Sequence, residues 1–505
     1  MSGIFRLWLA ALLGLLPLAV PGNGQQPTAA DSTLFTDATT THLPVDDLDG
    51  LSMDARPGDL DGDGDLDLFI ANEFRRNILL LNDGLGVFAN GSAQVPPTTR
   101  DSEDAALADF DLDGDLDAVI VSEDDRINEF FVNDGDAAFA ATTGRFPSHG
   151  ISNAVLAPDI DSDGTADLLI GNGGPDGAQN LLFLNDGTGF FTDATDRLPA
   201  RRDTTQDVEW GDIDNDGDAD ILLGNEDANR LLINDGSGTF AEGDPAALPL
   251  RQAIEETREA DLGDIDGDGD LDAYFANVVL FNRGTPASRQ NRLLLNDGSG
   301  RFTDRTGGLP PDDDNSFDAD FVDLDQDGDL DIITGNAFPD QQYRVYENDG
   351  SGVFTDATAR VLPPGIRGSG FDIEAADYNA DGRIDLYLAG RGTPDLLLLG
   401  RPLPTSVEAP AEPDRFALEA NYPNPFNSGT TIPFQLDRTG IVQLHIFNLA
   451  GQPVRTLAEW PLPSGAHRVG WDGRDQRGQA LASGAYIYRL RQGERVATGK
   501  LLLLR

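Results

Sequence analysis

The sequence predicts an all-β protein, in which a seven-bladed β-propeller is followed by a small β-sandwich. Three observations support this prediction. A nine-residue acidic pattern recurs seven times between residues 59 and 385, four short strand-like segments accompany the copies, and the pattern is absent beyond residue 400, where a proline-rich segment begins. Repeats of about fifty residues with four strands each are typical of propeller blades.

The first residues predict an export signal. Arg6 precedes an apolar run, Leu7–Val20, and small residues follow as far as Gly24. A short positive segment, an apolar stretch of this length and a small-residue cleavage zone are typical of a signal peptide, which we place at 1–24. A membrane anchor is the alternative, but the run is short for a span and Pro17 interrupts it. We therefore expect no integral membrane segment after cleavage.

The repeats are predicted to occupy 31–400 and to close into a ring. Within a repeat, two apolar runs such as Leu66–Ala71 and Asn77–Leu81 lead to an Asn-Asp-Gly turn and a short final strand. The last repeat lacks this turn and strand, whereas an isolated copy of the strand occurs at Leu34–Thr39. If that segment completes the last blade, no sheet edge is left open at the seam. An open β-solenoid is the main alternative.

Each copy of the acidic pattern, D-x-D-x-D-G-x-x-D, is predicted to hold one Ca²⁺, up to seven in all. Calcium prefers six to eight oxygen ligands, and the glycine at position 6 permits a sharp turn. Position 7 varies and includes an arginine, so it is expected to offer its backbone carbonyl while its side chain points to solvent. Positions 2 and 8 are apolar or aromatic and are expected to face the blade core.

The candidate metal ligands occupy positions 1, 3, 5, 7 and 9 of the seven loops. They are Asp59, Asp61, Asp63, Asp65 and Asp67; Asp109, Asp111, Asp113, Asp115 and Asp117; Asp159, Asp161, Asp163, Thr165 and Asp167; Asp212, Asp214, Asp216, Asp218 and Asp220; Asp264, Asp266, Asp268, Asp270 and Asp272; Asp323, Asp325, Asp327, Asp329 and Asp331; and Asp377, Asn379, Asp381, Arg383 and Asp385.

Three alternatives to a calcium site exist for such acidic loops. An EF-hand needs a glutamate at position 12, where this chain has residues such as Ile70 and Leu388. Magnesium demands near-octahedral geometry with several waters, so a flexible oxygen-rich loop favours calcium. Acidic turns without metal remain the third possibility, against which the sevenfold recurrence argues.

The composition excludes several classes of function. The chain has 88 acidic and 35 basic residues, a formal charge of −53. This charge excludes a nucleic-acid binder that works through a basic surface, because phosphate binding needs the opposite sign. The absence of cysteine from the sequence excludes disulfides, a thiol nucleophile and zinc–thiolate sites.

A second acidic pattern precedes the loops. Five residues before six of the seven loops stands a carboxylic acid, on a strand that is expected to line the central channel. Two roles are open: a ring that holds a cation or a cationic ligand, or hydrogen bonding to the backbone of a neighbouring blade, which is the simpler of the two. The residues are Asp54, Asp104, Asp207, Glu259, Asp318 and Asp372, with Ala154 as the exception.

The segment Gly58–Asn72, followed by the Leu-Leu-Leu-Asn-Asp-Gly run, resembles the FG-GAP/VCBS repeat family and the calcium-bearing blades of integrin α-subunit heads. The resemblance extends over 31–400. It implies calcium-binding propellers used for adhesion, for glycan or protein recognition, or as scaffolds attached to enzymes. It does not identify a ligand.

The C-terminal part is expected to be a separate module. Residues 401–413 predict a proline-rich linker and 414–505 a small Ig-like β-sandwich. Its elements Asn421–Asn427, Phe447–Val454 and Lys500–Arg505 resemble the FlgD-Ig-like, type IX secretion sorting domain of gliding and related bacteria. The resemblance implies export by the type IX secretion machinery, often with attachment to the surface. A passive Ig-like spacer is the alternative.

Two functions compete. The first is a secreted or bacterial cell-surface propeller, monomeric and non-enzymatic, that binds Ca²⁺ and recognises a glycan or a protein. The second is a polysaccharide lyase or hydrolase on a propeller scaffold, which needs a paired general acid and base in a cleft. No such pair can be told apart in the sequence from the calcium ligands, so no catalytic residue is assigned.

Overall fold

The acidic repeats fold into short antiparallel strands, because each alternates strand-forming runs with turn residues. The computed structural model describes residues 33–44, 50–146, 150–174, 176–249, 255–280, 288–338, 342–402, 416–418, 421, 424, 426, 430–436, 438, 440–448, 452–462, 465–471, 473–477, 479, 481–492 and 495–503. The predicted signal peptide and residues 403–413 of the predicted linker lie outside this part. The chain divides into two compact units, Met1–Pro404 and Thr405–Arg505, each described by itself.

The described strands of the first unit pair antiparallel in seven sets of four, the first two of which are joined into one eight-stranded sheet where Glu73 and Arg75 pair with Asp101 and Arg100. The sets are β2 (Ser52–Gly58), β3 (Asp67–Arg75), β4 (Ile78–Asn82) and β5 (Phe88–Asn90); β6 (Arg100–Ala108), β7 (Asp117–Ser122), β8 (Glu129–Val132) and β9 (Ala140–Thr142); β10 (Ser152–Leu156), β11 (Leu168–Asn172), β12 (Leu181–Asn185) and β13 (Phe191–Asp193); β14 (Thr205–Gly211), β15 (Asp220–Asn225), β16 (Arg230–Asn234) and β17 (Phe240–Glu242); β18 (Thr257–Gly263), β19 (Asp272–Asn277), β20 (Arg292–Asn296) and β21 (Phe302–Asp304); β22 (Ser316–Val322), β23 (Asp331–Asn336), β24 (Gln342–Asn348) and β25 (Phe354–Asp356); and β26 (Gly370–Ala376), β27 (Asp385–Gly390), β28 (Leu396–Gly400) and β1 (Phe35–Asp37).

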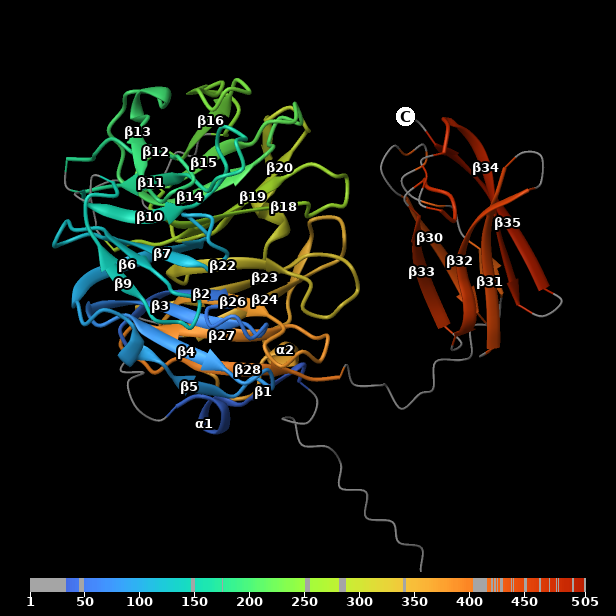
Figure 1. Cartoon of the computed structure of the whole chain (residues 1–505), viewed down its shortest axis with the longest axis horizontal. Coiled ribbons are helices and arrows are strands. Elements are labelled where there is room, and N and C mark those ends of the chain that lie inside the picture. Colours follow the sequence, from blue (N-terminus) through green and yellow to red (C-terminus); the bar gives the residue numbers. More distant parts are fainter. Residues whose placement is uncertain are drawn as a thin grey trace, which may run out of the picture. The chain divides into compact units, whose positions relative to one another are not determined.

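The last set joins the two ends of the repeat region. β1 pairs antiparallel with β28, with Phe35 opposite Gly400 and Asp37 opposite Leu398, and Figure 1 shows the dark blue β1 beside the orange β28. The N-terminal strand thus supplies the fourth strand that the last repeat lacks, and this part of the prediction is confirmed. Pairing leaves no open edge on β28 at the seam.

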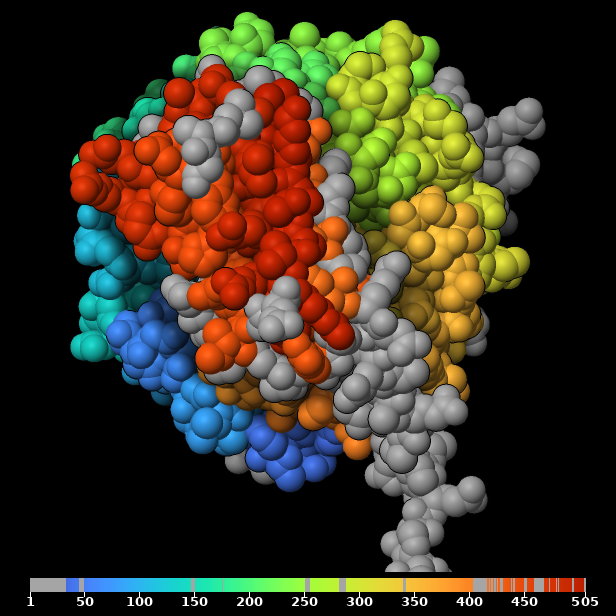
Figure 2. Space-filling model, turned by 90° about the vertical axis from the view of Figure 1, so that its right-hand side faces the viewer, coloured from blue at the N-terminus to red at the C-terminus, as the bar shows by residue number. Residues whose placement is uncertain are grey.

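The first strand of each set lies at the centre of the unit. These strands contact one another in the cyclic order β2, β6, β10, β14, β18, β22 and β26, and β26 in turn contacts β2. In Figure 2 the colours accordingly follow one another around the outline of this unit, from blue through green and yellow to orange. Repeated four-stranded sheets around a central channel are the architecture of a β-propeller.

The second strand of each set is packed on both faces. Every residue of β7, β15, β19, β23 and β27 is buried, because the neighbouring sheets cover both of its faces. This explains why these strands are nearly continuous apolar runs after the initial aspartate. The predicted inward direction of position 2 is also confirmed: Leu60, Phe110 and Tyr378 are at most 1% exposed, whereas the residues at position 8 are half-buried.

A β-bulge recurs in the first strand of every set. In β2 the pairing with β3 shifts between Ser52 and Asp54, and equivalent shifts occur in the other six sets. The extra residue redirects the strand. As a result, the side chains six, five and three residues before the loop reach the central channel in five of the repeats, and two of the three do so in the second and third repeats, where Ala106 and Ala154 do not.

The second unit is a small β domain with two sheets. One sheet has the order β29 (Ala417–Leu418), β30 (Thr430–Leu436), β33 (Gly465–Trp471), and the other has the order β32 (Pro453–Leu462), β31 (Gly440–Phe447), β34 (Gly484–Gln492), β35 (Arg495–Leu503). Side chains from both sheets, among them Phe434, Leu444 and Leu490, form one core. This agrees with the predicted β-sandwich; β32 was not expected from the sequence.

Helical structure in the described part is confined to single turns: α1 (Thr39–His42), α2 (Thr358–Val361), η2 (Ser92–Gln94), η3 (Thr195–Arg197) and η4 (Thr306–Gly308). None of these helices has the length and apolar character needed to cross a bilayer.

Candidate metal centres and the central channel

The acidic loops connect the first and second strands of each set, and their backbone is bent at two positions. The glycine at position 6 has a positive φ in every loop, for example 97° at Gly64 and 101° at Gly217, as the sequence predicted. Position 4 is also left-handed, with φ of 57° at Leu112 and 61° at Gln326, which the sequence did not indicate. The carboxylate at position 1 accepts a hydrogen bond from the amide of position 6 in all seven loops, at 3.1 Å for Asp59 and Gly64.

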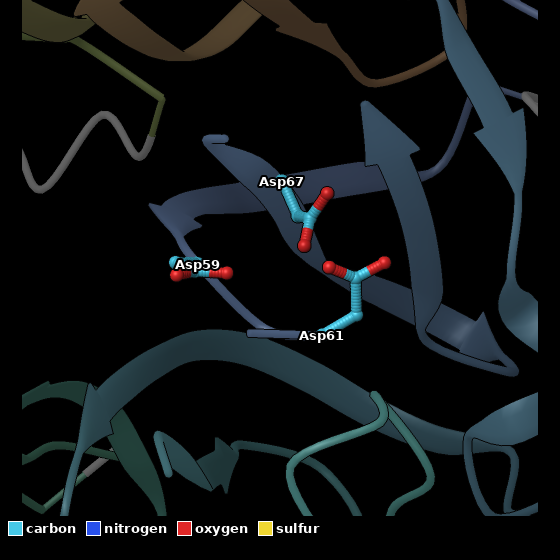
Figure 3. Close-up of side chains that lie close together, drawn as sticks. All are labelled: Asp59, Asp61 and Asp67. Carbon is cyan, nitrogen blue, oxygen red and sulfur yellow. The ribbon is translucent and has the colours of Figure 1, made fainter. Parts of the chain in front are cut away.

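This bend brings carboxylates of each loop together. Oxygens of Asp59, Asp61 and Asp67 lie within 4.8 Å of one another, and Figure 3 shows their side chains facing a common point. The corresponding triads in the next two loops are Asp109, Asp111 and Asp113, and Asp159, Asp161 and Asp167. Two carboxylates about 5 Å apart repel each other by about 3 kcal/mol at an effective dielectric constant of ~20, so a cation at this point would relieve a considerable repulsion.

Ten loop carboxylate oxygens are buried and have no hydrogen-bond partner among the described residues. They belong to Asp59, Asp111, Asp117, Asp161, Asp212, Asp214, Asp264, Asp266, Asp323 and Asp325. An unpaired buried polar atom is costly, and a hard cation such as Ca²⁺ is the partner that carboxylate oxygens accept most readily. The residues present in the first six loops therefore fit a calcium ion.

The seventh loop differs. The Arg383 guanidinium group at position 7 forms an ion pair with Asp381 at position 5 of the same loop and also donates to the carbonyl oxygen of Gly400, at 3.2 Å. The Asp377 and Asn379 side-chain oxygens both accept from the Asp381 amide, at 3.0 and 3.1 Å. This loop thus contains its own positive charge, and none of its carboxylate oxygens is among the unpartnered ones.

The aspartate at position 9 begins the second strand and holds the loop against the rest of its blade. Asp67 is fully buried and accepts from the amides of Leu60, at 3.0 Å, and Asn82, at 2.8 Å. Burial raises the pKa of this carboxyl to about 6, and the same cause raises that of Asp272 to about 7. Position 9 therefore combines a structural role with a place beside the candidate ion.

The side chain at position 7 was expected to point to solvent, but in the structure it is covered by the Asn-Asp-Gly turn. The Asp65 carboxylate lies against Gly84 of the Asn-Asp-Gly turn, where any side chain on that glycine would clash with it. Thr165 at the equivalent position is only 8% exposed. The turn folds back over the loop, which could not be read from the sequence because the two segments are separated by the second and third strands.

The asparagines of five of the six turns join neighbouring blades, a role that the sequence analysis missed, whereas Asn234 Nδ2 donates to Ala219 of its own loop. Asn296 Nδ2 donates to the carbonyl oxygen of Leu271 in its own loop, at 3.1 Å, and to that of Ile213 in the preceding blade, at 2.7 Å. Asn82 makes the same pair of bonds to Leu66 and Tyr378 across the seam. The recurrence of asparagine at the same position of all six turns is the sequence signal that could have indicated this role.

The acids that precede the loops also connect blades, as the simpler of the two readings predicted. Oδ2 of Asp54, Asp104, Asp207 and Asp372 accepts the backbone amide of the adjoining inner strand, at distances from 2.6 to 3.0 Å. Asp318 departs from this pattern, because its Oδ2 is buried and has no partner in the described part of the chain.

A second level of acids lines the channel two residues further along the same strands, at Glu209, Asp261, Asp320 and Glu374. The sequence analysis missed this level, although the two-residue period of a strand could have revealed it. Burial, followed by the neighbouring charge of Asp372, raises the pKa of Glu374 to about 8. Arg56 lies among the acids and contacts Asp54, Asp104 and Glu374 at 2.8, 3.0 and 3.4 Å.

The chain was compared with known proteins. No curated protein sequence matches it. Among solved structures, the chain resembles PorZ, described as an essential bacterial surface component of the type-IX secretion system of Porphyromonas gingivalis, with 14% identity, a TM-score of 0.40 and coverage of 87% of this chain and 58% of PorZ. It also resembles the SapL1 lectin, with 14% identity, a TM-score of 0.38 and coverage of 63% of this chain and 99% of the lectin. A third similar structure is that of the Vibrio cholerae biofilm matrix protein Bap1, with 10% identity, a TM-score of 0.35 and coverage of 79% of this chain and 66% of Bap1. The chain thus spans less than two thirds of PorZ.

Family models match both units. The FlgD Ig-like domain matches residues 424–494. The FG-GAP-like repeat matches 59–120, 109–170, 159–223, 212–275, 277–334 and 336–388, which together make up well over half of the chain. With its repeated four-stranded sheets and its acidic loops, this chain belongs to the FG-GAP-like repeat family and carries a FlgD Ig-like domain near its C-terminus.

Proposed function

We propose that this protein is a secreted or cell-surface, calcium-stabilised propeller that recognises a glycan or a protein without acting as an enzyme. The observation that carries the calcium part is the set of ten buried loop oxygens without partners. Because they occur in the first six loops, whereas Arg383 pairs with Asp381 in the seventh, we propose six calcium ions of comparable affinity rather than seven.

Calcium titration tests this proposal directly. The apo protein should melt at a lower temperature than the calcium-loaded protein, because an ion that binds only the native state stabilises it by mass action. Calorimetric titration of the chelator-treated chain should give six equivalents. An unchanged melting temperature after chelation, or no heat of binding, would contradict the proposal.

The recognition part rests on two exposed aromatic side chains of the propeller. Phe74 and Phe338 are 52% and 41% exposed and both have a positive φ, 54° and 32°, an unfavourable conformation for a bulky residue. They lie at or just beyond the ends of the second strands β3 and β23, which point to the same face of the ring. An exposed aromatic pair held in a strained conformation favours a contact surface.

A glycan array and a panel of surface proteins, each probed with and without calcium, test this surface. The Phe74→Ser and Phe338→Ser double variant should lose binding while its melting temperature stays close to that of the parent. The matched control is Phe190→Ser. Phe190 is 51% exposed and lies in the turn that precedes the outer strand β13. Turnover of a polysaccharide by the purified protein would overturn the non-enzymatic assignment.

We propose export by the type IX secretion machinery, because the FlgD Ig-like match coincides with the sorting-domain motifs of the sequence. In a type IX-competent host, removal of residues 414–505 should leave the propeller in the periplasm. A fusion of 401–505 to a reporter with its own signal peptide should reach the cell surface or the medium. Retention of that fusion in the periplasm would contradict the sorting role.

A further inference from the structure

The central channel contains a strongly acidic cavity of about 200 Å³. Among the side chains that line it, eleven are carboxylic acids and two, Arg56 and Arg258, are guanidinium groups. The cavity is separate from the acidic loops, since residues of all seven inner strands line it and each loop begins only after its inner strand has ended.

The two guanidinium groups form ion pairs with acids on only part of the channel wall. Arg56 is held among Asp54, Asp104 and Glu374. Arg258 is engaged at the rim by Glu256, at 2.9 Å, and by Gln206. The remaining arc, formed by β14, β18 and β22, contains six acids and no ion pair among the described residues. We call it the acidic arc; its members are Asp207, Glu209, Glu259, Asp261, Asp318 and Asp320.

Asp318 supplies an independent sign that the acidic arc lacks a partner. The residue is 5% exposed, and its Oδ2 atom is buried without a hydrogen bond, whereas its equivalents in four other blades bond to the neighbouring strand. Burial and the charge of Asp320 raise the pKa of Asp318 well above its usual range. A bound cation would satisfy this atom and favour the ionised form of the whole arc.

The shape and walls of the cavity indicate an organic cation. Its volume exceeds that of a single ion, and the acids stand on two levels of each strand, ~7 Å apart along the strand, a span that a diaminobutane unit can bridge. Phe317 and Phe371 also line it, stacked at 4.3 Å between ring centroids, and Phe338 packs edge-on against both. These rings offer an apolar wall to a methylene chain.

We propose that the acidic arc binds a linear alkylammonium ligand, with its ammonium groups on the carboxylates of β18 and β22 and its methylene chain against Phe317 and Phe371. The same chemistry is presented by a free polyamine and by the lysine side chain of a partner. The inference goes beyond the proposed recognition function, because the carboxylates that would hold this ligand lie inside the channel.

Calorimetric titration of the full chain with spermidine, with calcium kept saturating so that the loops are occupied, tests the proposal. Binding should saturate at one equivalent. Asp318→Asn and Asp320→Asn should each weaken it about tenfold, since each removes one charge-assisted contact. Asp318 Oδ2 makes no hydrogen bond among the described residues, so the Asp318→Asn variant should still fold. A melting curve checks that both variants do. Asp196→Asn, at an exposed position outside the channel, is the matched control and should bind as the parent does.

Two further ligands distinguish a free polyamine from the lysine side chain of a partner, and magnesium tests whether the site binds a metal ion instead of an organic cation. Tighter binding of 1,4-diaminobutane than of Nα-acetyl-lysine amide indicates a free polyamine, and the reverse indicates a lysine side chain. Magnesium is added to a parallel sample at matched ionic strength. Displacement of spermidine by magnesium at equal charge would show a metal site instead and overturn the proposal, as would the absence of spermidine binding or equal affinity in the parent and the Asp318→Asn variant.

Discussion

At the scale of single residues, the seventh loop differs from the other six in the charge that it contains. Six loops place only acids or Thr165 at position 7, whereas the seventh places Arg383 there. The sequence analysis expected Arg383 to offer its backbone carbonyl and to point its side chain to solvent. The structure shows that its guanidinium group instead pairs with Asp381, a candidate ligand of its own loop, so a loop that keeps the aspartates at positions 1, 5 and 9 need not offer the same set of free oxygens.

Arg383→Asp should therefore create a calcium site. The change removes the internal cation and restores the residue that five other loops have at position 7. Calorimetric titration should give one calcium equivalent more than the parent, and the calcium-dependent rise in melting temperature should increase. Arg367→Asp, at an exposed arginine outside the loops, is the control. Equal stoichiometry in the Arg383→Asp variant and the parent would contradict the assignment.

The turn asparagines make a second prediction at this scale. Asn296→Ala removes the donor for two carbonyl oxygens, those of Ile213 and Leu271. Leaving buried acceptors unpaired costs about 1–3 kcal/mol, so the free energy of unfolding measured in urea should fall by about this amount. Ser299→Ala in the same turn loses only an exposed bond to Asp297 and should change it by less than about 0.5 kcal/mol. Similar losses in both variants would contradict the bridging role.

At the scale of elements, the seam is the most consequential pairing, because one three-residue strand connects the two ends of the repeat region. β1 adds backbone hydrogen bonds to β28, and Leu34 and Phe35 enter a core with Leu386 and Leu398. The sequence predicted this pairing from a missing strand at one end and a surplus strand at the other. It could not predict the shared core, which depends on how β1 lies against the sixth and seventh sets.

Phe35→Ala should open the seam. Phe35 is 2% exposed, and truncation of a buried phenylalanine costs about 3–5 kcal/mol. The urea midpoint should fall, and limited proteolysis should cut near residues 38–44 before the rest of the propeller unfolds. Thr36→Ala, exposed on the same strand, should leave both readouts unchanged. Proteolysis of the Phe35 variant at the rate of the parent would show that the seam contributes little.

At the scale of the whole molecule, the central channel collects acids from every blade but one, and the burial of these acids gives the fold a pH dependence. Burial raises the pKa of Asp261 to about 7. A carboxyl whose pKa is higher in the folded state binds more protons there than in the unfolded chain, so its contribution to stability falls as the pH rises from about 4 towards 7.

Asp261→Asn should remove this penalty. Asn cannot ionise, and its single Oδ1 can keep only one of the two bonds that Asp261 accepts, from the Leu262 amide on Oδ1 and from the Phe321 amide on Oδ2. The stability of the variant relative to the parent should therefore be lowest near pH 4, rise up to about pH 7 and stay constant above that, as measured by urea unfolding in saturating calcium. A stability difference that is independent of pH would contradict the raised pKa of Asp261.

The sequence by itself determined the all-β class, the acidic loops, the strand that completes the last repeat and the boundary between two modules, because each depends on local composition or on a pattern that repeats along the chain. Only the tertiary structure decided that Arg383 meets Asp381, that Asn82 meets Tyr378 across the seam, and that the Asp318 Oδ2 atom is buried without a partner among the described residues. These features depend on how side chains and neighbouring blades pack in three dimensions, and contacts between residues far apart in the chain cannot be derived from a local pattern.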